Sequence, residues 1–368
     1  MLNNDPLQVR VNLSERSYDI EIGTGNLTNL AKFVSSRATI SHALLISDEN
    51  VSALYAGGIV DCLQAAGIRI TQYNVKPGET SKSIEVVTNL WNQALADGAD
   101  RKTVVIALGG GVVGDLAGFI AATFTRGLDF FQVPTSLLAQ VDSSVGGKVG
   151  INLPNAKNMV GAFWQPQGVL IDTGVLDTLS DREYRAGLAE VVKYGVILDH
   201  EFFVYLEEHI DKINQRDAET LRYIVARCCQ LKADVVENDE RETTGLRAVL
   251  NYGHTFCHAF ESVCGYGVLL HGEAVSIGML CASRLAELLD RIPAESTKRQ
   301  YDLLSALNIP VQIPDVEIQP LLDAMQRDKK VEHGKLRFVL PTKIGHVELV
   351  GDVSPELASQ AIKDTAEG

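Results

Sequence analysis

Residues Val104–Asp115, with the sequence VVIALGGGVVGD, decide the fold class, because an apolar run leads straight into a run of glycines. Such an apolar run is typical of a strand buried on both faces of a parallel sheet. Glycines after the strand let backbone N–H groups approach a phosphate, and the N-terminus of the next helix adds positive potential. The spacing departs from G-x-G-x-x-G, so a tight packing turn remains an alternative.

Strand and helix signals alternate on both sides of this stretch. Strands are predicted as a hairpin of 8–13 with 17–22, and then at 43–47, 68–75, 104–108, 130–133 and 169–171. Amphipathic helices are predicted at 51–66, at 83–97 and from the glycines to about 124. This alternation predicts a Rossmann-like α/β domain with a mostly parallel sheet.

Helical periods replace strand signals after about residue 178. Helices are predicted at 181–195, 200–210, 218–237, 247–264, 273–289 and 297–307, and a late hairpin pairs 336–340 with 346–350. We therefore expect an α/β domain over 1–178 and an all-α domain over 179–368. Ligand sites favour domain junctions, so the active site is expected in the cleft between the two.

Composition excludes several classes of function. The 368 residues are 46% hydrophobic and 22% charged, with a net charge of −14, which argues against nucleic-acid binding but permits a small anionic substrate. No segment is apolar enough to span a membrane, and no secretory leader is apparent. The six cysteines form no C-x-x-C pair and are interpreted as reduced thiols, which favours a cytoplasmic location.

Polar loops follow several of the predicted strands. Residues 47–50 (SDEN) and 77–82 (PGETSK) stand where open α/β sheets bind ligands, although either could simply cap a helix. Residues 134–148 combine hydroxyls, glycines, a carboxylate and Lys148, with Arg126 before them and Lys157 and Asn158 after them. This mixture favours an oxyanion or phosphate site.

Histidines near residue 260 predict a metal site. His254 and His258 are four residues apart on one helical face, His271 follows after a short loop, and Glu190 could add a carboxylate. Spacing alone nominates His254, His258 and His271, with hydrogen-bonded core histidines as the alternative. Cations gather in the same half, at Lys193, Lys232, Arg247, Lys329 and Lys330. Acidic residues at 237–242 could be no more than a solvated turn.

Taken together, these strings resemble the 3-dehydroquinate synthase family. The matching segments run in the family's order through most of the chain and are 77–82, 109–115, 132–152, 190–193, 247–258, 271–273, 328–330 and 337–341. Two positions depart from the family pattern. Ser136 stands where the family usually has Thr, and Cys257 stands where Gly is common.

The resemblance implies a role for each group of residues. Zn²⁺, with Co²⁺ as an alternative, would be held by Glu190, His254 and His271, while His258 and Glu242 would handle protons. NAD would contact Asp48, Asn50, Glu79, Lys82, Gly110, Gly111, Val112, Asp115, Thr135, Ser136, Lys157 and Thr178. Substrate would meet Arg126, Asp142, Lys148, Asn158, Lys193, Lys232, Arg247, Asn251 and Lys329 or Lys330. Among these, Arg126, Lys148, Asn158 and Lys193 would also be catalytic.

The implied reaction converts 3-deoxy-D-arabino-heptulosonate 7-phosphate to 3-dehydroquinate and phosphate in the shikimate pathway of aromatic amino acid biosynthesis. It proceeds through transient oxidation by NAD, phosphate elimination, reduction, ring opening and an intramolecular aldol closure. The enzyme would be a phosphate-eliminating carbon–oxygen lyase, and family members are commonly homodimers. The alternatives are a sister cyclase acting on another heptulose or hexose phosphate, and a metal-dependent alcohol dehydrogenase of the glycerol-oxidising kind.

Overall fold

The computed structural model describes residues 6–154, 156–265, 267–327 and 336–367. By packing, the chain divides into two units. The first holds the described residues up to Leu179 together with Leu221–Arg241, and the second holds Ser180–Thr220 and the described residues from Glu242 onward.

A mostly parallel sheet organises the first unit, as the sequence predicts. Only the pairing of β1 with β2 is antiparallel among the strands of this sheet as described. The spatial order is β1 (Leu7–Val11), β2 (Tyr18–Gly23), β9 (Gly168–Asp172), β6 (Asp129–Pro134), β5 (Val104–Gly109), β3 (His42–Asp48) and β4 (Arg69–Val75).

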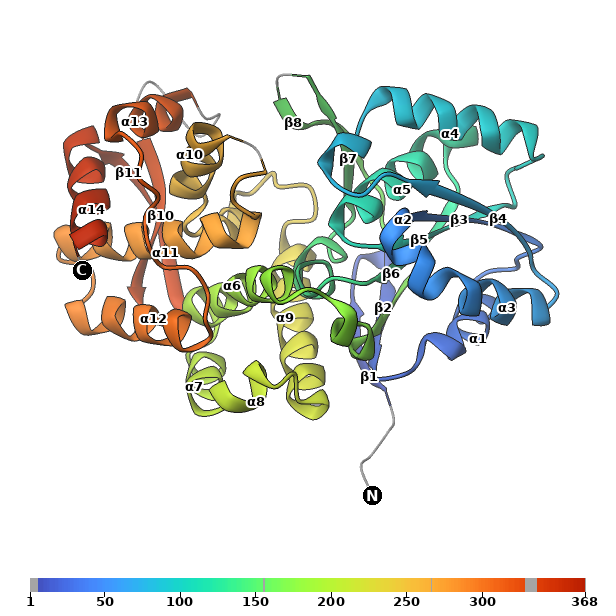
Figure 1. Cartoon of the computed structure of the whole chain (residues 1–368), viewed down its shortest axis with the longest axis horizontal. Coiled ribbons are helices and arrows are strands. Elements are labelled where there is room, and N and C mark those ends of the chain that lie inside the picture. Colours follow the sequence, from blue (N-terminus) through green and yellow to red (C-terminus); the bar gives the residue numbers. More distant parts are fainter. Residues whose placement is uncertain (1–5, 155, 266, 328–335, 368) are drawn as a thin grey trace. The chain divides into compact units, whose positions relative to one another are not determined.

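Helices cover both faces of this sheet (Figure 1). On one face, α4 (Ile84–Ala96) and α5 (Gly111–Thr123) pack against Leu44 and Ile46 of β3. On the other face, α1 (Leu30–Ser35) and α3 (Gly57–Ala65) pack against Ala43 and Leu45. Successive side chains of β3 thus enter two different cores, which explains why the strand is apolar throughout rather than alternating.

The strand order reverses between β3 and β5. From β3 the chain moves outward to β4, whereas from β5 it moves the opposite way, through β6 to β9. Ser47 pairs with Leu108 in register, and its Oγ donates a hydrogen bond of 2.7 Å to the Leu108 carbonyl. The carboxyl ends of these two strands therefore meet at a topological switch point, where open α/β sheets bind their ligands.

Three features of the first unit were not predicted. Residues 134–148, expected as a loop, contain a π-helical turn at Ala139–Ser143, and β7 (Lys148–Leu153) pairs with β8 (Ala156–Phe163) in a separate hairpin. The helix α9 (Ala218–Asn238) also belongs mostly to this unit, because Lys232 Nζ donates to the Asp142 carbonyl at 2.6 Å. A single boundary at 178/179 therefore does not describe the packing. The assignment of NAD to the first domain, and of metal and substrate to the second, stays a prediction.

Helices dominate the second unit, with α11 (His271–Leu288) almost wholly buried among them. It packs against α6 (Asp181–Leu198), α10 (His254–Cys264), α14 (Pro355–Glu367) and β10 (Leu336–Lys343). The predicted late hairpin is confirmed as β10 (Leu336–Lys343) with β11 (His346–Val353), so the unit is helical but not purely α. The remaining helices are α7 (His200–Glu208), α8 (Ile210–Asn214), α12 (Ala294–Ala306) and α13 (Ile318–Arg327).

The helix predicted over 247–264 is broken. A 3₁₀ segment spans Leu246–Asn251, and α10 begins only at His254. Gly253 separates the two with a φ of +77°, and a Cβ placed there would lie 2.7 Å from the backbone nitrogen of Met279. Only glycine satisfies both the left-handed backbone and the close approach to α11. The break makes His254 the first residue of its helix.

Candidate metal centre and ligand-binding residues

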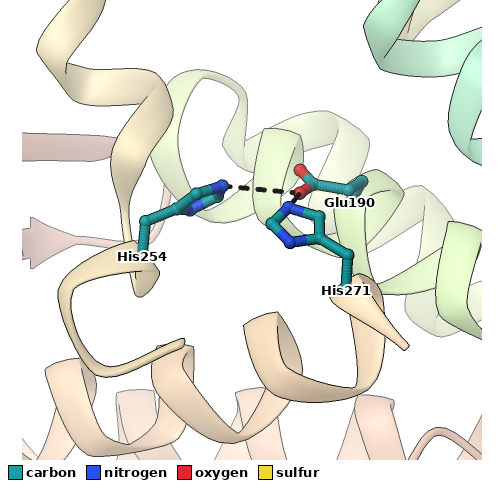
Figure 2. A group of neighbouring side chains, drawn as sticks. All are labelled: Glu190, His254 and His271. Atoms are coloured by element: carbon teal, nitrogen blue, oxygen red, sulfur yellow. Dashed lines mark ion pairs between the residues drawn. The ribbon is translucent and has the colours of Figure 1, made fainter. Parts of the chain in front are cut away.

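Three side chains from three helices of the second unit converge (Figure 2). Glu190 lies in the middle of α6, while His254 and His271 are the first residues of α10 and α11. The Nε2 atoms of His254 and His271 lie 3.8 and 3.6 Å from Oε1 of Glu190. All three donor atoms lie within 4.8 Å of one another.

This donor set fits a divalent cation. Zinc bonds of about 2.0–2.1 Å in tetrahedral geometry place neighbouring ligand atoms roughly 3.4 Å apart, close to the spacings seen here. Two imidazoles and a carboxylate are a usual catalytic zinc set, and three protein ligands leave one position for water or substrate. Glu190 is only 1% exposed, so its charge must be balanced by cationic neighbours, of which Lys193 is one.

Neighbouring groups hold two of these ligands. Lys193 Nζ contacts Oε2 of Glu190, so the carboxylate's second oxygen is engaged one helical turn along α6. Nδ1 of His254 lies 3.1 Å from the backbone carbonyl of Tyr252. If that nitrogen carries the proton, Nε2 is left with a lone pair facing Glu190.

The electrostatics of the two imidazoles differ. Burial, and then the nearby Lys193 ammonium, hold the pKa of His254 well below its usual range, which favours the neutral, metal-binding form. Burial acts the same way on His271, but the Cys257 thiol and then the carboxylates of Glu190 and Glu261 raise its pKa well above the usual range. A cation bound to Nε2 would displace the proton that these groups favour.

His258 occupies a different position from the one that spacing suggests. Its ring meets that of His254 edge-on, with centroids 5.6 Å apart. Among the described residues, the group of donors that includes His254 contains Glu190 and His271 but not His258. Four residues advance a helix by about 6 Å, so two side chains at this spacing need not reach one ion. The structure thus brings together Glu190, His254 and His271, the three residues that the resemblance names as ligands.

A second cluster lies in the first unit. Lys82 Nζ donates to Oδ2 of Asp115 and to Oδ1 of Asn158, each at 2.6 Å. The Lys82 side chain is only 3% exposed. Burial raises the pKa of Asp115, although the positive charge of Lys82 acts to lower it. Lys82, expected at the cofactor, therefore contacts both Asp115, which is also expected there, and Asn158, which is expected at the substrate.

Other residues expected to contact NAD lie at the carboxyl ends of the strands. Oδ1 of Asp48 accepts hydrogen bonds from the backbone nitrogens of Asn50 (2.9 Å) and Val51 (3.1 Å), which is the helix-capping alternative. Gly110 is the N-cap residue just before α5, and no side chain caps this helix, so the backbone N–H groups of the first turn keep their anion-binding capacity. Thr135 is buried and donates its backbone N–H to the Gly109 carbonyl. Ser136 lies close to the glycine turn, because a Cβ added at Gly110 would be 3.3 Å from its Oγ. Val112 lies in that first turn, and Gly111 would bring a Cβ to 3.1 Å from Ser143 Oγ.

The residues expected at the substrate are spread over both units. In the first unit, Lys232 Nζ lies 3.0 Å from Oδ1 of Asp142, and Arg126 and Lys148 are exposed. In the second unit, Arg247 Nε lies 3.4 Å from Oε1 of Glu242. Asn251 and Lys157 are half-buried. Lys329 and Lys330 lie outside the described residues.

Three neighbours of these residues were missed by sequence reasoning. Asn152 donates to Glu79 Oε2 at 2.7 Å, Tyr55 shares a hydrogen bond of 2.6 Å with Thr178, and Glu261 contacts His271. Only Glu261 had a signal in the sequence, because it follows His254 by seven residues and therefore shares its helical face.

A glycine turn at a sheet switch point, together with a buried imidazole–carboxylate donor set, defines a class of two-unit, metal-dependent α/β enzymes. Models of the N-terminal and C-terminal parts of 3-dehydroquinate synthase match residues 72–186 and 187–331. The 3-dehydroquinate synthase of Rhodopirellula baltica is 53% identical over 97% of each chain. That of Desulforamulus reducens is 48% identical, over 94% of this chain and 96% of its own. The chain belongs to the 3-dehydroquinate synthase family.

Solved structures of other cyclases share the fold. A 2-deoxy-scyllo-inosose synthase in complex with carbaglucose-6-phosphate, NAD⁺ and Co²⁺ is 26% identical, with a TM-score of 0.88 over 97% of this chain and 100% of that one. A 2-epi-5-epi-valiolone synthase from Streptomyces hygroscopicus, with NAD⁺ and Zn²⁺ bound, is 29% identical, with a TM-score of 0.88 over 97% and 98%. A glycerol dehydrogenase from Schizosaccharomyces pombe, at 18% identity and a TM-score of 0.66 over 95% and 88%, shares the fold alone.

Proposed function

We propose that this chain converts 3-deoxy-D-arabino-heptulosonate 7-phosphate to 3-dehydroquinate and phosphate, with NAD and Zn²⁺ as cofactors and Co²⁺ as an alternative metal. The observation that carries the proposal is the convergence of Glu190, His254 and His271 in a chain that is 53% identical to a 3-dehydroquinate synthase. The nearly complete coverage of both chains means that no large part of the relative lacks a counterpart here.

Glu190, His254 and His271 would hold the metal. A divalent cation there supplies a Lewis acid that polarises the substrate's C5 hydroxyl and lowers its pKa. Lys193 orients the Glu190 carboxylate by contacting Oε2, which leaves Oε1 facing the two imidazoles. The chain's own contribution is thus a buried, fixed set of donors with one open coordination position.

The switch point between β3 and β5 would hold the dinucleotide. NAD supplies a hydride acceptor that returns the hydride within the same turnover, so it is not consumed. The uncapped N-terminus of α5 at Gly110 would bind the pyrophosphate. Asp48, Glu79 and Thr178 would bind the remaining parts of the cofactor, with Lys157 and the hydroxyls of Thr135 and Ser136 beside them.

Cations of both units would bind the two anionic groups of the substrate. Arg247 is 3% exposed, and its planar guanidinium can grip a carboxylate through two hydrogen bonds. Lys232 is paired with Asp142, which would keep the ammonium in place for the substrate. Arg126, Lys148, Asn158 and Lys193 complete the anion-binding set, with Asn251 and one of Lys329 and Lys330.

Proton transfer would fall to His258 and Glu242. His258 stands next to His254 without belonging to the metal donors, a suitable position for a proton carrier beside a metal. Glu242 is exposed and contacts Arg247, which links it to the proposed carboxylate-binding guanidinium.

The direct test is an assay of phosphate release from the heptulosonate phosphate with NAD and Zn²⁺, with absorbance at the NADH band followed in parallel. The proposal expects continuous phosphate release at a catalytic amount of NAD and no net NADH. The structural likeness to other cyclases makes hexose and heptulose phosphates without a carboxylate the matched controls. Phosphate release from such a sugar alone would identify a sister cyclase, and stoichiometric NADH would identify a dehydrogenase.

Two finer assignments accompany the proposal. The chain would act as a homodimer, which sedimentation of the purified protein tests. It would work in the cytoplasm, where its six cysteines, none of which forms a disulfide bond in the structure, would stay reduced. No helix of the described residues is long and apolar enough to cross a membrane.

A further inference from the structure

The imidazole of His271 lies between two carboxylates. Its Nε2 is 3.6 Å from Oε1 of Glu190, on the side of the proposed metal. Its Nδ1 is 3.4 Å from Oε1 of Glu261, on the opposite side of the ring. The proposed function uses Glu190 and leaves Glu261 without a role.

Helix α10 places Glu261 at this position. Glu261 follows His254 by seven residues, which is two helical turns, so both side chains leave the same face of α10. That face packs against α11, which begins at His271. The Glu261 side chain is only 11% exposed, and a carboxylate this deeply buried is retained where it has a partner to hold.

The other histidine of the donor set shows the same arrangement. Nδ1 of His254 lies 3.1 Å from the Tyr252 carbonyl, while its Nε2 faces Glu190. Metal-binding histidines usually donate their second N–H to a carbonyl or a carboxylate, which fixes the tautomer and the orientation of the ring. For His254 the acceptor beside Nδ1 is the Tyr252 backbone carbonyl, whereas for His271 it is the Glu261 side chain.

We propose that Glu261 is a positioning residue for the metal centre: it accepts the Nδ1 proton of His271 and thereby keeps the Nε2 lone pair directed at the cation. Its negative charge also makes the imidazole a stronger ligand. The inference rests on the metal site of the proposed function. Cys257 is the competing neighbour, but its Sγ lies 3.9 Å from Nδ1, and a neutral thiol is a weak acceptor.

The test measures metal affinity rather than activity. Metal-free full-length chain is titrated with Zn²⁺ or Co²⁺ against a competing chelator. Glu261→Ala is expected to weaken binding by roughly 10- to 100-fold, the usual cost of losing such a partner. Glu261→Gln keeps an oxygen acceptor but no charge, so a smaller loss of roughly a few-fold is expected. Cys257→Ala is the matched control and should bind as the wild type does.

Thermal unfolding without metal separates positioning from folding. The metal-free Glu261→Gln chain should unfold close to the wild type, while added metal raises its melting temperature less. If Glu261→Ala fails to fold, the metal affinity of Glu261→Gln tests the inference instead. Wild-type affinity in Glu261→Gln would then overturn it. Wild-type affinity in Glu261→Ala also overturns it and leaves the metal site intact. A wild-type chain that binds no metal refutes the proposed site and this inference together.

Discussion

Lys82 Nζ lies 2.6 Å from Oδ2 of Asp115, and the Lys82 side chain is 3% exposed. Lys82 follows β4, whereas Asp115 lies in the first turns of α5, just after the glycine run. The same ammonium donates to Asn158 Oδ1 in β8. One buried cation thus fixes three segments near the proposed dinucleotide site.

Replacing Lys82 should destabilise the first unit. Lys82→Met leaves a largely buried Asp115 without its cation, and breaking such a pair costs up to about 3–5 kcal/mol. Because burial already raises the pKa of Asp115, the carboxyl should take up a proton nearer neutral pH in the variant. Urea unfolding without NAD measures the loss, and adding Asp115→Asn should recover part of it. An unchanged urea midpoint in Lys82→Met would contradict the pair's structural role.

Gly272 allows α11 to approach α6 beside the metal ligands. A Cβ there would lie 1.8 Å from the backbone carbonyl oxygen of Ala186. Gly272→Ala should therefore push the helices apart, costing about 1–3 kcal/mol or more, and displace the adjacent His271 from Glu190. Melting temperature and bound metal should both fall. Gly351→Ala, where the added methyl meets nothing within 4 Å, is the control and should leave both unchanged.

The ion pair of Arg16 with Glu240 is expected to contribute to the free energy of unfolding in a pH-dependent way. The hydrogen bond and then the charge of Arg16 help to hold the pKa of Glu240 below its usual range. A carboxyl with a depressed folded pKa stabilises above its unfolded value of about 4.3 and loses that stability as pH falls through the folded value. Arg16 is 53% exposed, so Arg16→Ala should cost only about 0.5 kcal/mol at pH 7. Urea midpoints should show this difference shrinking below pH 4, and a loss that stayed constant with pH would refute the linkage.

Lys148 is predicted to act on substrate and not on folding. Its side chain is exposed at the start of β7, so Lys148→Ala should leave the melting temperature unchanged. Turnover should fall by roughly 100-fold or more, as is usual when a catalytic group is removed. NAD binding, followed by fluorescence, should persist. Turnover at the wild-type rate would exclude the proposed role.

Local patterns made most of the first unit predictable. The strand before the glycines and the apolar run in β3 are buried on both faces, and such strands carry their signal within a few residues. The hairpin of β7 and β8 gave no such signal, because it packs on α5 rather than inside the main sheet. The position of α9 depends on contacts such as that of Lys232 with Asp142, far apart in sequence.

The metal donors were only partly visible in the sequence. Spacing nominated His254, His258 and His271 together, and it cannot show which of them the structure brings together with Glu190. Glu190 lies more than sixty residues earlier in the chain, so the sequence offered it only as a possible carboxylate, and the resemblance to a family then implied it as a ligand. The seven-residue spacing shows that Glu261 shares a helical face with His254, but its contact with His271 depends on the packing of α10 on α11.

The most direct test of the central claim is the metal content of the purified chain, measured by elemental analysis beside Glu190→Ala, His254→Ala and His271→Ala. We expect one zinc or cobalt ion per wild-type chain and little or none in each of these variants, while Cys257→Ala should retain the full amount. Stoichiometric metal in any of the three ligand variants would contradict the site formed by Glu190, His254 and His271.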